Sequence, residues 1–74
     1  MHPVGSRIYE ITVAGRAGRV VCAEFDDCEI TVGADTTILR SELPDQAALA
    51  GLVQRIIGLR LDVILVQAVA SPPP

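Results

Sequence analysis

Two cysteines carry most of the reactive chemistry that this 74-residue sequence offers. Cys22 and Cys28 have five residues between them, and the one histidine, His2, lies close to the N-terminus. Thiolate ligands of zinc usually come in pairs separated by roughly two to four residues, often with histidines. This spacing fits no such pattern, and unpaired cysteines commonly pack as small hydrophobic residues. We therefore expect two reduced, buried thiols, and the sequence predicts neither a metal site nor a cofactor.

Carboxylates cluster around the second cysteine. A calcium site needs about six oxygen ligands at alternate positions of one loop, with a glycine at the turn. These carboxylates lack that spacing, so we expect a solvated acidic edge and not a cation site. The four residues are Glu24, Asp26, Asp27 and Glu29.

All six basic residues are arginines, and the chain has no lysine and no asparagine. Arg40, Arg55 and Arg60 could line an anion pocket at a helix end. The alternative that we favour is solvated charge, or local pairing with Glu42 or Asp62. No nucleophile stands at a recognisable spacing from a general base, so the sequence predicts no catalytic residue.

The overall composition excludes several classes of function. Half of the residues are apolar, one fifth are charged, and the formal net charge is -3. The isoelectric point near 4.8 argues against nucleic acid, which requires a basic surface. The longest apolar stretch, residues 61–70, is far shorter than the roughly 20 residues of a membrane-spanning helix. Residues 1–7 lack the regions of a signal peptide, so we expect a cytoplasmic protein that binds neither nucleic acid nor membrane.

The N-terminal half is rich in strand signals. Residues 7–13 predict a strand with Tyr9, Ile11 and Val13 on its buried face and Ile8 on the other. The clearest hairpin joins residues 28–32 to residues 36–40 across Gly33-Ala34-Asp35, which is a typical turn composition.

Residues 19–26 fit two structures. As a strand they place Val21, Ala23 and Phe25 on one face, and as a helix they place Val21 and Phe25 one turn apart. The glycine-containing loop before them favours a hairpin with the first strand.

One long helix is predicted next, beginning at Pro44 and ending at Gly58. A final strand is expected over residues 63–68. The helix carries an apolar stripe, and the spacing of its members is that of one helix face: Leu49, Leu52, Val53, Ile56 and Leu59. The predicted core combines most of this stripe with the strands: Tyr9, Ile11, Val13, Ile30, Leu39, Leu49, Leu52, Val53 and Ile56.

The helix also carries a recognisable motif. Leu43-Pro44-Asp45-Gln46-Ala47-Ala48-Leu49, followed by Gly51-Leu52-Val53 and Leu59-Arg60-Leu61, resembles the signature of a family of short uncharacterised proteins common in actinobacterial genomes. The similarity extends over residues 8–67. It implies the order βαββαβ, a ferredoxin-like split βαβ with a short first helix, and it assigns no activity to any residue.

The chain departs from that family at three places. It has no tryptophan between Val20 and Phe25, where the family has two. Ala50 stands where the family often has histidine, and Arg60 stands where a glycine would end the helix. The first departure weakens the expectation of a first helix.

The expected fold is therefore α+β, an antiparallel sheet of four or five strands with one long helix on one face. The resemblance favours the ferredoxin-like order βαββαβ, and the local signals favour β-β-β-β-α-β. We expect a flexible N-terminus at residues 1–6, a single domain at residues 7–69 and a proline-rich tail at residues 70–74.

The final strand predicts self-association. Regular alternation would place Val63 and Leu65 on one face and Ile64 and Val66 on the other, so both faces are apolar. One helix layer covers one face only, and a strand that is apolar on both sides needs a second cover. We therefore expect a homodimer, joined through the open sheet face or the strand edge, with Ile8, Ile64 and Val66 at the interface.

The expected function is a non-catalytic, self-associating protein–protein interaction or regulatory module. Two alternatives are a small-ligand-binding protein with a pocket at the dimer interface, and a minimal cofactor-free dimeric enzyme of the ferredoxin-like type.

Overall fold

A computed structural model of the chain describes residues 6–70. Residues 1–5 of the predicted lead-in and 71–74 of the predicted tail lie outside this range. The described part contains four strands and two helices, so the fold is α+β as predicted. Its elements are β1 (Arg7–Ala14), α1 (Arg19–Glu24), β2 (Glu29–Val32), β3 (Thr36–Leu43), α2 (Gln46–Gly58) and β4 (Val63–Ala70).

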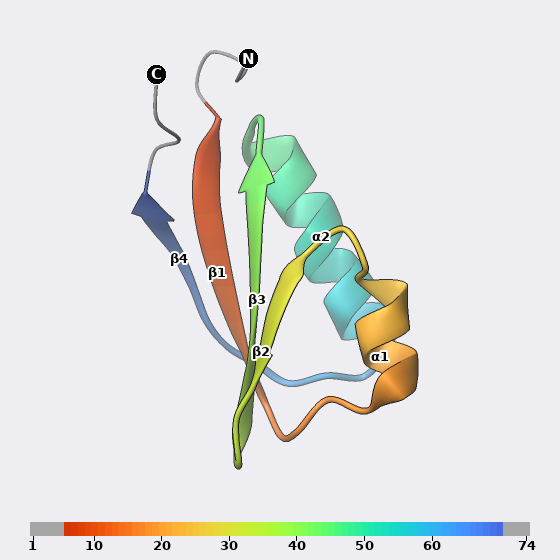
Figure 1. The fold of residues 1–74 in the computed structure, drawn as a ribbon. Helices are drawn as coiled ribbons and strands as arrows, with labels where there is room; N and C mark the ends of the chain where they lie inside the picture. The colour runs from red at the N-terminus through yellow and green to blue at the C-terminus, as the bar shows by residue number, and fades with distance from the viewer. Residues whose placement is uncertain (1–5, 71–74) are drawn as a thin grey trace.

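The strands form one antiparallel sheet in the order β2-β3-β1-β4, which places β1 and β3 in the centre and β2 and β4 at the edges. Both helices lie on the same face of the sheet (Figure 1). Each helix connects two strands that are not neighbours, because α1 links β1 to β2 across β3 and α2 links β3 to β4 across β1. Within residues 6–70, the opposite face carries no helix.

Residues 19–24, which follow β1, form the helix α1. The predicted hairpin of residues 19–26 with the first strand is therefore wrong. Strand β1 pairs with β3 instead, with Ile11 opposite Leu39. The amide of Phe25 donates to the carbonyl of Val21 at 3.3 Å, and the Phe25 side chain is buried. A helix of six residues is not stable alone, so the burial of Phe25 against the sheet decides the structure here. The order β-β-β-β-α-β is thereby excluded.

Helix α2 is 13 residues long and is capped by the residue after Pro44. The Asp45 carboxylate accepts a hydrogen bond from the amide of Ala48 at 2.8 Å, which satisfies one of the free donors of the first turn. Pro44 therefore precedes the N-cap. The prediction that it is the first helical residue is wrong.

The C-terminal end of α2 is closed by Arg60 and not by Gly58. Arg60 has a φ of 62°, the left-handed conformation that glycine usually adopts at this position. Its amide donates to the carbonyl of Ile57 at 2.8 Å, and the amide of Leu61 donates to the carbonyl of Ile56 at 3.4 Å. These two bonds define a Schellman motif, formed here with arginine in place of glycine.

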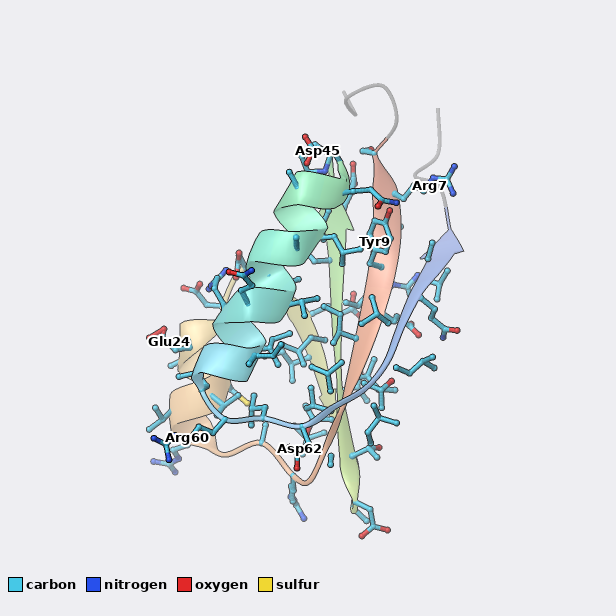
Figure 2. The ribbon with its side chains drawn as sticks, turned by 180° about the vertical axis from the view of Figure 1, so that it is seen from behind. Arg7, Tyr9, Glu24, Asp45, Arg60 and Asp62 are labelled. Atoms are coloured by element: carbon cyan, nitrogen blue, oxygen red, sulfur yellow. The ribbon has the colours of Figure 1, made fainter. Side chains whose placement is uncertain are left out.

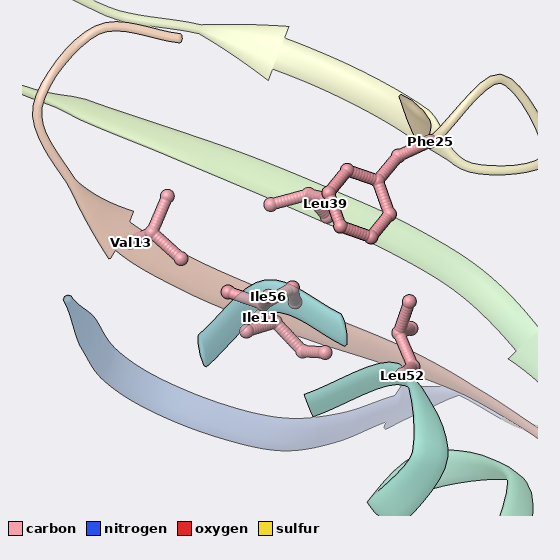
Figure 3. Close-up of a cluster of buried hydrophobic side chains, with 6 residues drawn as sticks. All are labelled: Ile11, Val13, Phe25, Leu39, Leu52 and Ile56. Carbon is pink, nitrogen blue, oxygen red and sulfur yellow. The ribbon is translucent and has the colours of Figure 1, made fainter. Parts of the chain in front are cut away.

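The core lies between the central strands and the helices (Figure 3). It confirms most of the predicted residues, whereas Ile30, Leu49 and Val53 are only partly buried at its margin. Leu59, the last member of the predicted stripe, is 39% exposed. Phe25 is a core residue that the sequence-based list lacks. The buried cluster is Ile11, Val13, Phe25, Leu39, Leu52 and Ile56, and Tyr9 is also buried.

Thr37 is a buried polar residue that ties the loop after β1 to the sheet. Its hydroxyl donates to the carbonyl of Gly15 and accepts from the amide of Ala17, both at 2.9 Å. Gly15 itself has a φ of +89°, which a side chain would strain. The Thr37 hydroxyl thus holds the loop that leads into α1, because it acts as both donor and acceptor to that loop.

Candidate interaction surface

The two cysteines are unpaired, and both are partly buried. Among residues 6–70, no group of three or more His, Cys, Asp or Glu side chains is placed to hold a metal ion. Cys28 packs at the margin of the core, and its sulfur lies 3.9 Å from a carboxylate oxygen of Asp27. Burial, followed by the charge of Asp27, raises the pKa of the Cys28 thiol above its ordinary value of 9.0, despite smaller opposing contributions from Ser41 and Arg55.

The raised pKa predicts that the Cys28 thiol reacts slowly with alkylating reagents at neutral pH. In a Cys22→Ser variant, iodoacetamide should modify Cys28 with a pH–rate inflection at higher pH than that of free cysteine, because the thiolate is the nucleophile. Asp27→Asn should move the inflection toward lower pH and speed the reaction at pH 8, since it removes a negative charge beside the thiolate. An inflection at or below that of free cysteine, or no response to Asp27→Asn, would contradict the raised pKa of Cys28.

The acidic turn after α1 is held by Arg55 of α2. The Arg55 guanidinium donates to the carbonyl of Glu24 at 2.8 Å, lies 3.5 Å from a carboxylate oxygen of Asp27, and stacks 4.8 Å from the centroid of the Phe25 ring. Arg55 therefore joins the C-terminal end of α1 to α2. Arg55 is thus paired locally and does not line the anion pocket that the sequence left open, and its acidic partner is Asp27, not Glu42 or Asp62.

Arg55→Ala is expected to lower the free energy of unfolding by about 1–2 kcal/mol, which is modest because the side chain is half exposed. Arg55→Lys should recover only a minor part, since an ammonium lacks the planar fork that contacts three groups together. Chemical denaturation of both variants measures this, with Gln54→Ala on the exposed side of α2 as control. Equal stability of Arg55→Ala and the control would disprove the joining role.

The open face of the sheet is more polar than the sequence predicted. One row of residues crosses all four strands there, because Arg40 pairs with Glu29 on one side and Glu10 on the other, and Glu10 pairs with Gln67. The Arg40 guanidinium lies 3.6 Å from a carboxylate oxygen of Glu10. This row is polar across all four strands, so it interrupts any apolar surface on the open face.

Of the eight large apolar side chains that are exposed in the described part of the chain, four lie on β4. Ile64 is 58% exposed, Leu65 47%, Val66 37% and Val69 38%. The strand runs for eight residues, Val63–Ala70, without one charged side chain. We call the residues Ile64, Leu65, Val66 and Val69 the β4 patch.

The register of β4 revises which face each residue occupies. Leu65 lies opposite Thr12, whereas Val63 lies opposite Val13, so the pairing skips Ile64. Directly paired residues share a face, which places Val66, opposite the buried Ile11, on the helix-bearing face. The predicted alternation, with Ile64 and Val66 together on the open face, is therefore wrong.

The predicted interface residues thus occupy different surroundings. Ile64 stands at the register shift and is well exposed, Val66 faces the helix side, and Ile8 on β1 is partly buried opposite Ala70. Their role in an interface stays a prediction. The sequence located the apolar strand correctly and misplaced its faces, since it gives no signal for a bulge.

The two edges of the sheet differ. Strand β2 is four residues long and begins with Glu29. A short edge strand and a charged side chain on it are two features that protect sheet edges from pairing. Strand β4 is twice as long and uncharged. Within residues 6–70 the structure contains no pocket, and no helix there has the length and apolar character required to cross a bilayer.

These features define a small α+β chain with a polar open face and one long, uncharged, apolar sheet edge. The chain belongs to the family described as Domain of unknown function (DUF8691), whose model matches residues 8–67. This agrees with the sequence resemblance in extent and in pointing to an uncharacterised family. No curated protein and no solved structure shows significant similarity to the chain.

Proposed function

We propose that this protein is a non-catalytic module that acts by associating with a second copy of itself, as a protein–protein interaction or regulatory unit. The observation that carries the proposal is the β4 patch on an uncharged edge strand. Exposed apolar patches of this kind mark interaction sites. Twofold association of identical chains is the commonest way of covering them.

The fold is consistent with this role. We assign it to the ferredoxin-like class, which the element order βαββαβ and the sheet order β2-β3-β1-β4 support. With both helices on one face (Figure 1), the edge strands stay accessible. We retain a cytoplasmic location without nucleic-acid or membrane partners, on the acidic balance of charge.

Self-association is tested by sedimentation or light scattering at micromolar concentration. We expect a mass near twice the monomer value of 7.8 kDa. Ile64→Asp, at a well-exposed position, should lower the association constant of the dimer at least tenfold, because dimerisation would bury an unpaired charge. Val20→Asp introduces the same charge at a residue that is 77% exposed on α1, and should leave the mass unchanged. A wild-type mass of 7.8 kDa would refute the proposed function.

A further inference from the structure

The edge of the sheet at β4 is a place where two copies can associate. We propose that β4 pairs antiparallel with β4 of a second copy, so that two four-stranded sheets continue as one sheet of eight strands. This inference rests on the proposed function and specifies its partner and its contact. It requires three things from the structure: a free edge that can pair, a segment with regular backbone, and charges that permit two identical strands to meet.

The edge of β4 can pair because nothing in the described chain covers it. Strand β1 occupies one side of β4, and both helices lie on a face of the sheet and not beside its edge (Figure 1). In an antiparallel ladder every second residue directs its N–H and C=O away from the neighbouring strand. Half of the β4 backbone groups therefore face outward. An edge that is long, apolar and uncharged is the kind that pairs with another strand.

The regular part of β4 is Leu65 to Ala68. These residues pair one for one with Thr12 to Tyr9, and the register shifts on both sides of this segment. Bulges bend a strand and interrupt its ladder, so we place the pairing with the second copy on Leu65 to Ala68. The same bulges limit its length, which favours a discrete pair over an extended ribbon.

Charge permits pairing with a second copy and favours an antiparallel direction. A twofold axis places each residue near the axis against itself, so a charged strand centre would repel its own copy, and the centre here is Val66 and Gln67. At the ends, Asp62 precedes β4, and Arg7 begins β1 beside the other end of β4 (Figure 2). Antiparallel pairing brings Asp62 of the second copy toward the end that carries Arg7. Parallel pairing would instead bring the two Asp62 residues together.

This end charge sets direction more than affinity. Arg7 and the Asp62 of the second copy are separated by two strand spacings, about 10 Å, which is close to the screening length at physiological salt. Affinity comes from backbone hydrogen bonds and from apolar contacts on both faces, because Leu65 and Val66 point to opposite sides. The assembly stops at two chains, since the remaining edge, β2, carries the charge of Glu29, whereas Leu65 to Ala68 is uncharged.

A scan of single cysteines tests the geometry. In a Cys22→Ala, Cys28→Ala background, cysteine is placed in turn at Leu65, Val66, Gln67 and Ala68, and oxidation by copper phenanthroline is followed by the fraction of covalent dimer. A twofold antiparallel pair brings one position to a Cα separation of about 5 Å, within reach of a disulfide. For a residue next to the one on the axis, the two symmetry-related Cα atoms are offset from each other by about 7 Å along the strand direction, because each lies two residues beyond its opposite neighbour. We expect one strong crosslink, at Val66→Cys or Gln67→Cys, at least tenfold above its neighbours.

Two controls make the result decisive. Thr31→Cys on the open face of β2 reports a dimer joined face to face, and circular dichroism confirms that each variant is folded. As a second measurement on the unmodified chain, amides within Leu65 to Ala68 should exchange at least tenfold more slowly at high than at low protein concentration. A wild-type dimer that crosslinks at Thr31→Cys, at several β4 positions equally or at none would overturn the edge pairing alone. A monomeric wild type would overturn the proposed function itself.

Discussion

Leu52→Ala is expected to lower the free energy of unfolding by about 2–5 kcal/mol. Leu52 is 6% exposed in the middle of α2, where it packs into the cluster with Ile11 and Ile56. Truncation removes buried methyl groups and leaves a cavity that the sheet cannot close, because strands fixed by backbone hydrogen bonds move little. Typical stability for a chain of this length is about 4–11 kcal/mol, so the loss is a large fraction of the total.

The matched control is Leu59→Ala, which makes the same chemical change on the same predicted stripe. Leu59 is 39% exposed and lies just after the end of α2, so its truncation should cost about 1 kcal/mol or less. Urea denaturation of the two variants measures the difference. If the two midpoints agreed, the burial that separates Leu52 from Leu59 would not determine the stability of this helix.

The sequence predicted the parts of the fold whose burial follows a regular period. The alternation of Tyr9, Ile11 and Val13 located the buried face of β1, and the spacing of Leu52 and Ile56 located the buried face of α2. Both periods are set by backbone geometry alone. The stripe failed most clearly at Leu59, which is exposed because α2 ends at Gly58 and Leu59 is its C-cap.

Other features depend on long-range contacts that no local pattern encodes. Residues 19–24 became a helix because β1 pairs with β3, 22 or more residues further along the chain, and not with its immediate successor. The register shift at Ile64 is likewise imposed by the partner strand. For the candidate interaction surface, composition identified β4 as an apolar strand, whereas the faces of Ile64 and Val66 required the register. Thr37 gave no signal at all, since its burial arises from the loop at Gly15 and Ala17.

Phe25 combines these two kinds of information. The sequence offered a helical pairing of Val21 with Phe25, and the structure shows why it matters. Helix α1 itself contributes no fully buried residue, so its C-cap residue Phe25, at 1% exposure, is what anchors it to the core. The Arg55 guanidinium stacks over the outer side of that ring. The short helix is therefore held mainly by one aromatic ring and one arginine from α2, with the partly buried Val21 adding to its contact with the core.

Phe25→Ala is accordingly expected to cost about 3–5 kcal/mol and to release α1 before the rest of the chain unfolds. Phe25→Leu, which keeps most of the volume, should cost less than about 2 kcal/mol. Hydrogen exchange distinguishes anchoring from a general loss of stability. In Phe25→Ala the amides of α1 should lose protection more than those of β1 and β3, whereas in Leu52→Ala the loss should be uniform.

The arginine supplies an independent check on the same anchor. If the ring is the platform for Arg55, then Arg55→Ala should cost less in a Phe25→Leu background than in the wild type, with a coupling of about 0.5–1 kcal/mol. The carbonyl of Glu24 and the carboxylate of Asp27 remain as partners in both backgrounds, so the coupling isolates the contact between guanidinium and ring. Additive effects, or a Phe25→Ala chain whose α1 amides stay as protected as those of β1, would show that α1 is held by other contacts.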